Sequence, residues 1–294
     1  MIGEAEIRRR AGQWGVDPGL LDLDYALGWL LAELYRIEKV RRSWIFKGGT
    51  CLRKCYFPDY RFSEDLDFSV PSDADEEATG KLVLRAAAGV RDRSGLDLQA
   101  SPLRTEQIRL PARTESWLEI RIYFRGVLPQ ARGASRLIRV QLDPNERVLL
   151  PTLERPLLHP YADKPRGTRI RCYDLAEILA EKLRAVCGQR VYPVSRDVYD
   201  IARLTREDPS CERRALSILS EKARAKGIDM RGALSRLTQR RSPYRLDWER
   251  NLVYLIPQTD RPSFPEAWDS VLGLVSRIRS PRSRKTRPRP ASRR

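Results

Sequence analysis

Two aspartates two positions apart, Asp65 and Asp67, are the residues of this chain best suited to chemistry. They lie in the segment Arg61–Phe68, RFSEDLDF, whose alternation of polar and apolar residues predicts a strand over residues 62–70. Residues i and i+2 share one face of a strand, so both carboxylates project together, with their Cα atoms about 7 Å apart. Paired carboxylates repel unless a cation lies between them, and hard oxygen ligands select Mg²⁺ or Mn²⁺. The alternative is a solvent-facing edge strand that displays acids.

A glycine pair between a lysine and a threonine, Lys47-Gly48-Gly49-Thr50, forms a second candidate site. Residues 44–50 are expected to form a short strand that breaks into this turn, and residues 50–57 a short helix. Glycines let backbone N–H groups turn toward a ligand, and a helix N-terminus favours an anion such as the β- and γ-phosphates of a nucleotide. The Walker motif G-x-x-x-x-G-K-[ST] is missing, and a bare Gly-Gly is more often a tight turn.

A lysine within an apolar stripe marks the third candidate. Residues 174–188, DLAEILAEKLRAVCG, have helical periodicity, and at 100° per residue Lys182 falls in the middle of the apolar stripe. Glu177, Glu181 and Arg184 fall on the opposite face, which is expected to be exposed. A lysine at the centre of a buried face is costly unless it meets a fixed negative partner, and a triphosphate would be one. The alternative is a lysine that snorkels from the rim of the core.

The segment Ser195–Asp200, SRDVYD, begins another expected helix, over residues 196–206. Ser195 is expected to cap this helix, with Asp197 in its first turn, which is a complete structural explanation for both residues. Functionally, Arg196 or Asp197 could face the same cleft as Lys182.

These segments need a scaffold, and the hydrophobic pattern changes character along the chain. Further strands are expected at 117–126 and 136–143, and further helices at 18–37, 73–94, 211–226, 230–239 and 264–279. A mixed α/β half thus precedes a helical half, with the proline-containing stretch 151–168 as the link. We predict an α+β fold in three parts, namely an α/β domain over 1–150, a helical domain over 151–275 and a basic tail over 276–294.

Basic residues outnumber acidic ones, and the formal net charge is +17. The tail over 276–294 holds nine basic residues and no acidic one, and its Pro, Ser and Arg content is typical of a disordered segment. Such a tail attracts polyanions, although a solvated extension without a specific role has the same composition. Three aromatic residues in the basic half could stack on bases, but core packing is the commoner role; they are Tyr244, Trp248 and Tyr254.

The chain lacks the features of several other protein classes. His159 is its only histidine, which argues against histidine-rich zinc sites and Ser-His-Asp catalysis. No run of 18 apolar residues predicts a membrane span, and the N-terminus has no apolar signal region. The five cysteines form no C-x-x-C pair, which favours a reducing compartment and hence the cytoplasm. Cys51 and Cys55 are expected to be small core residues.

The blocks KGGT, RFSEDLDF, AEKLRA and RDVYD, in this order, resemble the AbiEii/AbiGii nucleotidyltransferase toxin family, which includes the mycobacterial MenT toxins. The blocks run from Lys47 to Asp200, about half of the chain. The resemblance implies a DNA polymerase beta-like nucleotidyltransferase core with a mixed sheet, followed by a helical C-terminal domain. It also implies Mg²⁺-dependent transfer of a nucleotide from an NTP to the 3′ end of tRNA, by a growth-inhibiting toxin whose antitoxin is encoded nearby.

The resemblance assigns roles to individual residues. The catalytic set would be Ser63, Asp65, Asp67, Lys182 and Asp197, with Asp65 and Asp67 as metal ligands. The nucleotide would be held by Lys47, Gly48, Gly49, Thr50, Arg61, Ser63 and Lys182. Polymerase-like cores usually place a third carboxylate on a neighbouring strand, for which Asp143 is the first candidate and Glu119 the second.

Two other functions are compatible with these residues. On the same fold, the enzyme could place NMP on a protein hydroxyl instead of RNA. A nucleic-acid-binding protein with an inactive core would share the basic character, and it would bind RNA equally well after Asp65→Ala, with no turnover before or after the substitution.

Overall fold

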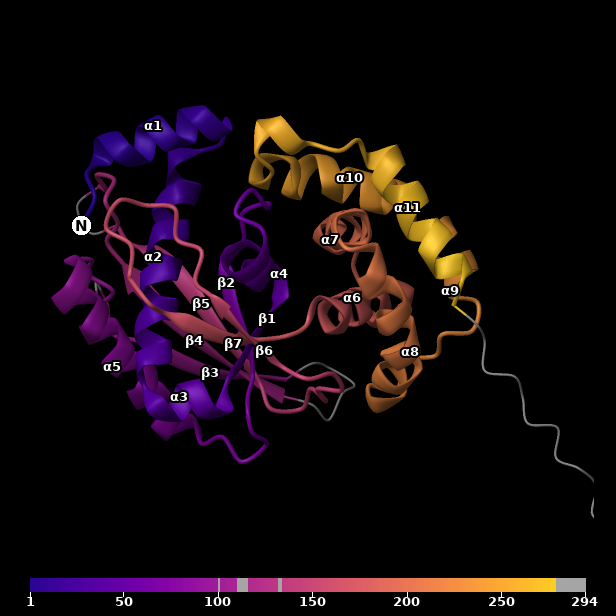
Figure 1. The fold of residues 1–294 in the computed structure, drawn as a ribbon, viewed down its shortest axis with the longest axis horizontal. Coiled ribbons are helices and arrows are strands. Elements are labelled where there is room, and N and C mark those ends of the chain that lie inside the picture. The colour runs from indigo at the N-terminus through magenta and orange to yellow at the C-terminus, as the bar shows by residue number, and fades with distance from the viewer. Residues whose placement is uncertain (100, 110–115, 132–133, 279–294) are drawn as a thin grey trace, which may run out of the picture.

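The computed structural model describes residues 1–99, 101–109, 116–131 and 134–278. Figure 1 shows a sheet with the N-terminal helices to one side and the C-terminal helices grouped to the other. Nearly all of the tail predicted over 276–294, from residue 279 onward, lies outside the described residues. None of the described helices has the length and apolar character needed to cross a membrane.

Within the described residues, seven strands form one mixed sheet in the order β3-β4-β5-β2-β1-β7-β6. The strands are β1 (Ile45–Lys47), β2 (Asp65–Ser69), β3 (Arg104–Arg109), β4 (Ser116–Phe124), β5 (Arg136–Asp143), β6 (Leu153–Pro156) and β7 (Arg169–Cys172). The central strand β2 runs antiparallel to β1 and parallel to β5. This arrangement puts the predicted aspartate pair in the middle of the sheet rather than at an edge.

The sequence pattern predicts β1, β2, β4 and β5 but not the other three strands. β3 is polar along most of its length, and β6 and β7 have four residues each, too few for an alternation to be recognised. β7 pairs with β1, so the sheet continues beyond residue 150 to Cys172. The division of the chain into domains stays a prediction.

The helices of the first half cover the sheet. They are α1 (Glu4–Trp14), α2 (Pro18–Arg36), α3 (Glu38–Ser43), α4 (Gly48–Cys51), which a π-helical turn η1 (Leu52–Tyr56) continues, and α5 (Glu76–Ser94). α2 begins with Pro18 in its first turn and with the Asp17 side chain as a cap, and 14 of its 19 residues are buried. It packs against α5 and the sheet, as its long apolar pattern requires.

The second half is helical, as predicted. Its elements are α6 (Leu175–Arg184), the π-helical turn η2 (Ala185–Gln189), α7 (Ser195–Glu207), α8 (Pro209–Ala225), α9 (Ala233–Gln239), α10 (Arg241–Asn251), the 3₁₀ turns η3 (Val253–Leu255) and η4 (Gln258–Asp260), and α11 (Phe264–Ser276). The predicted helices match α6 with η2, α7, α8, α9 and α11 to within a few residues. α1 and α10 escape prediction because both carry few apolar residues among many charged ones.

The face of α6 that is expected to be exposed is buried, so that expectation is wrong. α8 packs over this face and brings Lys222, whose Nζ lies 2.6 Å from Glu177 and 2.9 Å from Glu181. Arg184, also buried, pairs with Glu146 at 2.8 Å. Charged residues opposite an apolar stripe usually meet water, but here opposite charges from neighbouring segments take the place of water.

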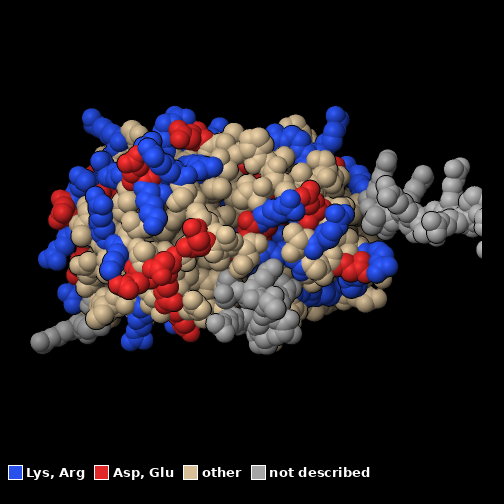
Figure 2. Space-filling model, turned by 90° about the horizontal axis from the view of Figure 1, so that it is seen from below, with Lys and Arg blue, Asp and Glu red and all other residues tan. Residues whose placement is uncertain are grey.

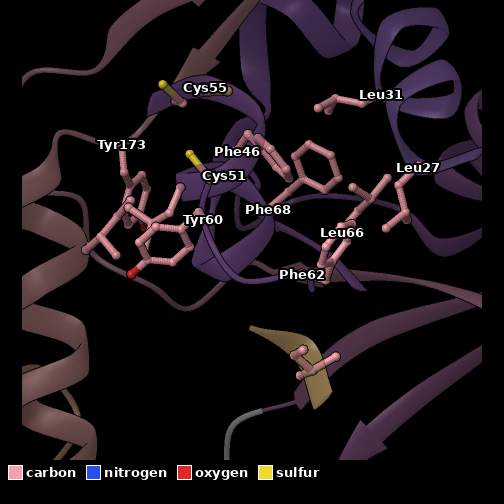
Figure 3. Packing of buried hydrophobic residues seen from close by; sticks show 14 of the residues in the cluster. Leu27, Leu31, Phe46, Cys51, Cys55, Tyr60, Phe62, Leu66, Phe68 and Tyr173 are labelled. Carbon is pink, nitrogen blue, oxygen red and sulfur yellow. The ribbon is translucent and has the colours of Figure 1, made fainter. Parts of the chain in front are cut away.

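The apolar side of β2 fixes the orientation of the whole strand. Leu66 and Phe68 are fully buried, and the Phe68 ring lies 5.1 Å from that of Phe46 on β1, centroid to centroid. Figure 3 shows these side chains pointing together into the core. Because alternate side chains face opposite ways along a strand, Asp65 and Asp67 must face away from this core.

Candidate active site

Asp65 and Asp67 stand on one face of β2, as the alternation predicts. The partner of Asp67 is Lys47 on β1 and Gln141 on β5, and the partner of Asp65 is Arg139 on β5. Residues in register on paired strands share a face, so these side chains surround the two carboxylates. Arg139 approaches Asp65 most closely, with 3.5 Å between Nη1 and Oδ1.

Two adjoining hollows open at this face and share Asp67, Lys182, Arg190 and Asp197. The first, the Lys47 hollow, has a volume of about 190 Å³ and is also lined by Lys47, Gly48, Asp143, Glu146, Ile178, Glu181, Arg184, Ala185 and Gln189. The second, the Ser63 hollow, has a volume of about 240 Å³ and is also lined by Gly49, Arg61, Ser63, Asp65, Gln141, Val194 and Arg196. The structure thus brings together side chains from the glycine turn, β2, α6 and α7, which the sequence places far apart.

The glycine turn lies against the aspartates without space for a side chain. Gly48 has φ +78°, and a Cβ added there would lie 2.3 Å from Oδ2 of Asp67. A Cβ on Gly49 would lie 2.5 Å from Nη2 of Arg61. Thr50 is buried, and its hydroxyl donates a hydrogen bond to the backbone carbonyl of Asp65, so this side chain ties the turn to β2. Only backbone from this turn can therefore approach a ligand beside Asp67.

A cluster of five charged residues, of which Arg61, Asp197 and Asp200 are buried, closes the other side of the Ser63 hollow. Nζ of Lys182 lies 2.6 Å from Oδ1 of Asp197 and 3.1 Å from Oδ2 of Asp200. Arg61 donates two hydrogen bonds of 2.7 Å to Asp200. Arg190 donates one of 2.9 Å from Nε to Oδ2 of Asp197. Three cations face two carboxylates, so the cluster keeps one positive charge with which to attract an anion.

Ion pairing keeps this cluster charged despite its burial. Burial alone would raise the pKa of Asp197, but Arg190 and Lys182 outweigh burial and hold that pKa far below its usual range. Burial would likewise lower the pKa of Lys182, but Asp197 and Asp200 raise it. At neutral pH, Lys182 is therefore an ammonium group held in one place, as a phosphate-binding cation must be.

Nearby cations compensate the two aspartates of β2 only in part. Burial, and then the neighbouring charge of Asp65, raise the pKa of Asp67 to about 6, although Lys47 and Lys182 oppose this shift. Burial also raises the pKa of Asp65 against the opposing charge of Arg139, whose Nη1 lies 3.5 Å from the buried Oδ1 of Asp65 without a well-formed hydrogen bond to it. Two crowded carboxylates with an unsatisfied oxygen fit a divalent cation that prefers oxygen ligands, namely Mg²⁺ or Mn²⁺.

The two candidates for a third metal carboxylate are held by cations. Asp143 lines the Lys47 hollow, and its Oδ2 lies 3.4 Å from Nζ of Lys47. Glu119, in register with Gln141 on the next strand, accepts a 2.7 Å hydrogen bond from Arg121. The role of either residue as a metal ligand stays a prediction.

Among the described residues, one group of three possible metal ligands comes within 4.8 Å of one another, and it is Cys51, Cys55 and Cys172. All three are free, buried and part of the hydrophobic core. The expectation that Cys51 and Cys55 are small core residues is confirmed.

The sequence patterns do not single out Arg190 and Asp200, which complete the charged cluster. Asp200 follows Asp197 by three residues on α7, so helical spacing places it on the same face, and the SRDVYD segment contained that signal. Arg190 follows η2 and belongs to no motif. Ser195 does not cap α7, because the helix begins at Ser195 itself, whose amide N–H donates to Oδ2 of Asp247 at 2.6 Å.

Comparisons with known proteins concern the family and the fold of this chain. The family model described as nucleotidyl transferase AbiEii toxin, Type IV TA system, matches residues 29–270. The crystal structure of JHP933 from Helicobacter pylori is similar, with a TM-score of 0.52 and 16% identity over 90% of this chain and 93% of that chain. MenT4, a nucleotidyltransferase toxin from Mycobacterium tuberculosis, has a TM-score of 0.51 and 18% identity over 95% of this chain and 100% of that chain. No curated protein sequence matches significantly. At these identities the structural likeness concerns the fold, and it confirms the predicted α+β nucleotidyltransferase fold.

Proposed function

The chain belongs to the AbiEii family of nucleotidyltransferase toxins of type IV toxin–antitoxin systems, and we propose that it transfers NMP from an NTP to the 3′ end of tRNA. One observation supports this function most strongly. Two carboxylates with raised pKa values, Asp65 and Asp67, face a hollow whose opposite wall carries the cationic cluster of Arg61, Lys182 and Arg190. In a metal-bound triphosphate, the metal ion supplies positive charge for the two carboxylates, and the phosphates supply negative charge for the cationic cluster.

The carboxylates of Asp65 and Asp67 would hold Mg²⁺ or Mn²⁺, with Asp143 as the candidate third ligand. When bound, such a cation neutralises phosphate charge and makes the α-phosphate more electrophilic. The glycine turn sets the position of Asp67, because Gly48 lies against its Oδ2. A carboxylate of the pair then accepts the proton of the attacking hydroxyl.

The phosphates of the NTP would lie in the Ser63 hollow. Backbone N–H groups of the turn from Gly48 to Thr50, with Ser63 and Arg61, would hold the terminal phosphates. Lys182 would neutralise the charge that develops on the departing pyrophosphate. Its pairing with Asp197 and Asp200 fixes the ammonium group before substrate binds, so little reorganisation is needed during the reaction.

The protein itself contributes little covalent chemistry to the reaction. The 3′-hydroxyl oxygen of the RNA attacks the α-phosphorus, the new P–O bond forms, and the bond to pyrophosphate breaks in line with it. Positioning and charge stabilisation by the residues above supply most of the rate enhancement. The single, buried histidine, His159, is not required for this route.

The positive charge of the chain suits an RNA acceptor. The formal net charge is +17, and Figure 2 shows, on the face in view, basic side chains interspersed with fewer acidic ones. Phosphate contacts with such a surface give sequence-independent affinity that weakens as salt rises. As in the rest of the family, a toxin of this kind would be controlled by an antitoxin.

A transfer assay tests the proposal. The protein is mixed with Mg²⁺, total tRNA and each α-³²P-labelled NTP in turn, beside an Asp65→Ala variant. Label on tRNA that the variant does not produce supports the proposal and identifies the donor nucleotide. Label on protein would indicate a protein-modifying enzyme instead. No label with tRNA still bound would indicate a nucleic-acid-binding protein with an inactive core.

A further inference from the structure

Two residues beside the hollows expose apolar surface that nothing in the described chain covers. Val191 is 81% exposed and Tyr192 is 79% exposed, more than any other large hydrophobic residue that the structure describes. They lie on the loop of residues 190–194 that joins η2 to α7. Such an exposed aromatic ring contributes little to folding by burial, and its face remains available for a ligand to stack on.

The backbone of this loop is held in place. Nη1 and Nη2 of Arg240 donate 2.9 Å hydrogen bonds to the carbonyl oxygens of Arg190 and Val191. The amide N–H of Arg190 donates to the carbonyl of Ala185 at 3.1 Å. The side chain of Arg190 is itself fixed by Asp197. The two residues that precede Tyr192 are therefore anchored, which reduces the entropy that a ligand of this loop must overcome.

The loop forms the edge of the proposed nucleotide site. Arg190 lines both hollows and Val194 lines the Ser63 hollow, whereas Tyr192, between them in sequence, lines neither. Two residues of chain span at most about 7 Å, so the Cα atom of Tyr192 lies within that distance of the Cα atoms of two residues that line the hollows. A nucleotide seated within them would leave the ring free for a second, neighbouring base.

The charges around this edge favour a nucleic acid. Arg196 lines the Ser63 hollow on the far side of Val194, and Arg240 stands at the start of α10, followed by the exposed Arg241 and Arg245. Arginines close in the chain or the fold to an exposed aromatic residue are typical of proteins that bind single strands, where bases stack and phosphates meet cations. Two apolar side chains alone are too small an area for a stable protein interface.

We propose that Tyr192, with Val191 beside it, is the platform on which the unpaired 3′-terminal base of the acceptor RNA stacks, so that its 3′-hydroxyl reaches toward Asp65 and Asp67. This inference rests on the proposed function, because it assigns the acceptor subsite of the same reaction. Stacking is tolerant of base identity, since every base has a π face, so the platform positions the strand end without selecting its sequence.

The sequence suggested other platforms, and the structure separates them. Tyr244 and Trp248 are buried in the core, which confirms core packing as their role. Tyr254 is 46% exposed on η3, so core packing does not account for it fully. Tyr192 is more exposed than Tyr254, and it belongs to none of the motifs named in the sequence analysis.

A direct binding experiment without NTP tests the platform independently of turnover. In a Tyr192→Trp variant, a short single-stranded oligoribonucleotide with a free 3′-hydroxyl should quench the fluorescence of the added indole. This fluorescence is obtained by subtracting the signal of the wild-type protein from that of the variant. Tyr192→Ala should weaken oligoribonucleotide binding about tenfold, and Tyr192→Trp should retain it. Leu84→Ala, which removes an exposed apolar residue on α5, should change nothing.

The outcomes of this binding experiment distinguish the ligands that could stack on Tyr192. Quenching by an NTP alone, and not by the oligoribonucleotide, would overturn the proposal in favour of the donor base. Equal oligoribonucleotide affinity in wild type and Tyr192→Ala, or no binding to either, would overturn it as well. If the indole is quenched and the alanine variant binds weakly while no label is ever transferred to tRNA, the platform stands and the proposed function fails.

Discussion

Lys182 reaches from α6 to α7 and places its ammonium group 2.6 Å from Oδ1 of Asp197. Asp200 lies on its other side at 3.1 Å, and Arg61 and Arg190 hold the remaining carboxylate oxygens. The lysine is thus fixed in the absence of any ligand, by partners that a phosphate need not displace. Because the cluster retains one net positive charge, the pairs orient the lysine without cancelling its attraction for an anion.

Replacing Lys182 should damage both binding and folding. In Lys182→Met, Asp197 and Asp200 keep one arginine each but lose their shared cation, and we expect the free energy of unfolding to fall by about 3 kcal/mol. Nucleotide transfer should fall at least about 100-fold, since a charge aimed at the leaving group is lost. Denaturant melts and transfer rates on the same preparation measure both effects. Unchanged NTP affinity together with unchanged rate would show that the lysine is only structural.

Asp67 should destabilise the metal-free protein at neutral pH. Its pKa is about 6 in the folded state and near 3.8 when unfolded, so between these values the folded protein binds the proton more readily. The free energy of unfolding should therefore fall as pH rises from about 4 to 6. Asp67→Asn removes the ionisation and should stabilise the metal-free protein at pH 7 by about 1–3 kcal/mol. Urea melts in EDTA at pH 4, 5, 6 and 7 check this, and a variant less stable than wild type at pH 7 would contradict it.

The same pKa should make metal affinity depend on pH. A protonated carboxyl is a poor Mg²⁺ ligand, so the Mg²⁺ concentration needed for half-maximal transfer should rise about tenfold for each pH unit below about 6. Saturating Mg²⁺ should restore much of the lost rate, because the cation stabilises the ionised form. Transfer rates over a matrix of pH and Mg²⁺ concentration measure this dependence. A midpoint that does not move between pH 5 and 7 would show that Asp67 is not a ligand.

The candidate catalytic side chains were more predictable than the contacts that hold them. Asp65 and Asp67 follow from strand periodicity, and the position of Lys182 within an apolar stripe signalled that a partner must exist. The sequence allowed Asp197 to face the same cleft, but its direct pairing with Lys182, and that of Asp200, arises only through the packing of α7 on α6. Tertiary contacts of this kind leave no periodic trace in the sequence.

The same limit explains the errors in the fold. Charged positions on α6 look exposed until α8 covers them with Lys222, and β7 is too short to show an alternation until β1 pairs with it. Local patterns predicted the long helices and the central strands, which are stabilised by their own apolar faces. Features that depend on contacts with a neighbouring element, such as a short strand or a buried charged face, were not predicted.

Gly48 should tolerate no side chain. In Gly48→Ala the added Cβ would lie 2.3 Å from Oδ2 of Asp67, and the backbone would have to keep φ at +78°. We expect a loss of about 1–3 kcal/mol of stability and a transfer rate reduced at least about 100-fold, because Asp67 must move. Gly12→Ala on α1 is the matched control, since nothing lies within 4 Å of its added Cβ. A Gly48→Ala variant with wild-type Mg²⁺ dependence would refute the close approach.

Lys222 offers a test that separates stability from chemistry. Its ammonium group is fully buried and lies within 3.0 Å of Glu146, Glu177 and Glu181, so Lys222→Met would leave three carboxylates around an apolar side chain. The free energy of unfolding should fall by about 3–5 kcal/mol. Lys81→Met, at an exposed pair on α5, should change it by no more than about 0.5 kcal/mol. Below the melting transition, the KM for NTP should stay within about twofold of wild type, because Lys222 lines neither hollow. Chemical denaturation and steady-state kinetics on the wild type and the two variants measure these quantities. A large rise in KM without a loss of stability would show that Lys222 acts on the nucleotide through Glu181 and Lys47.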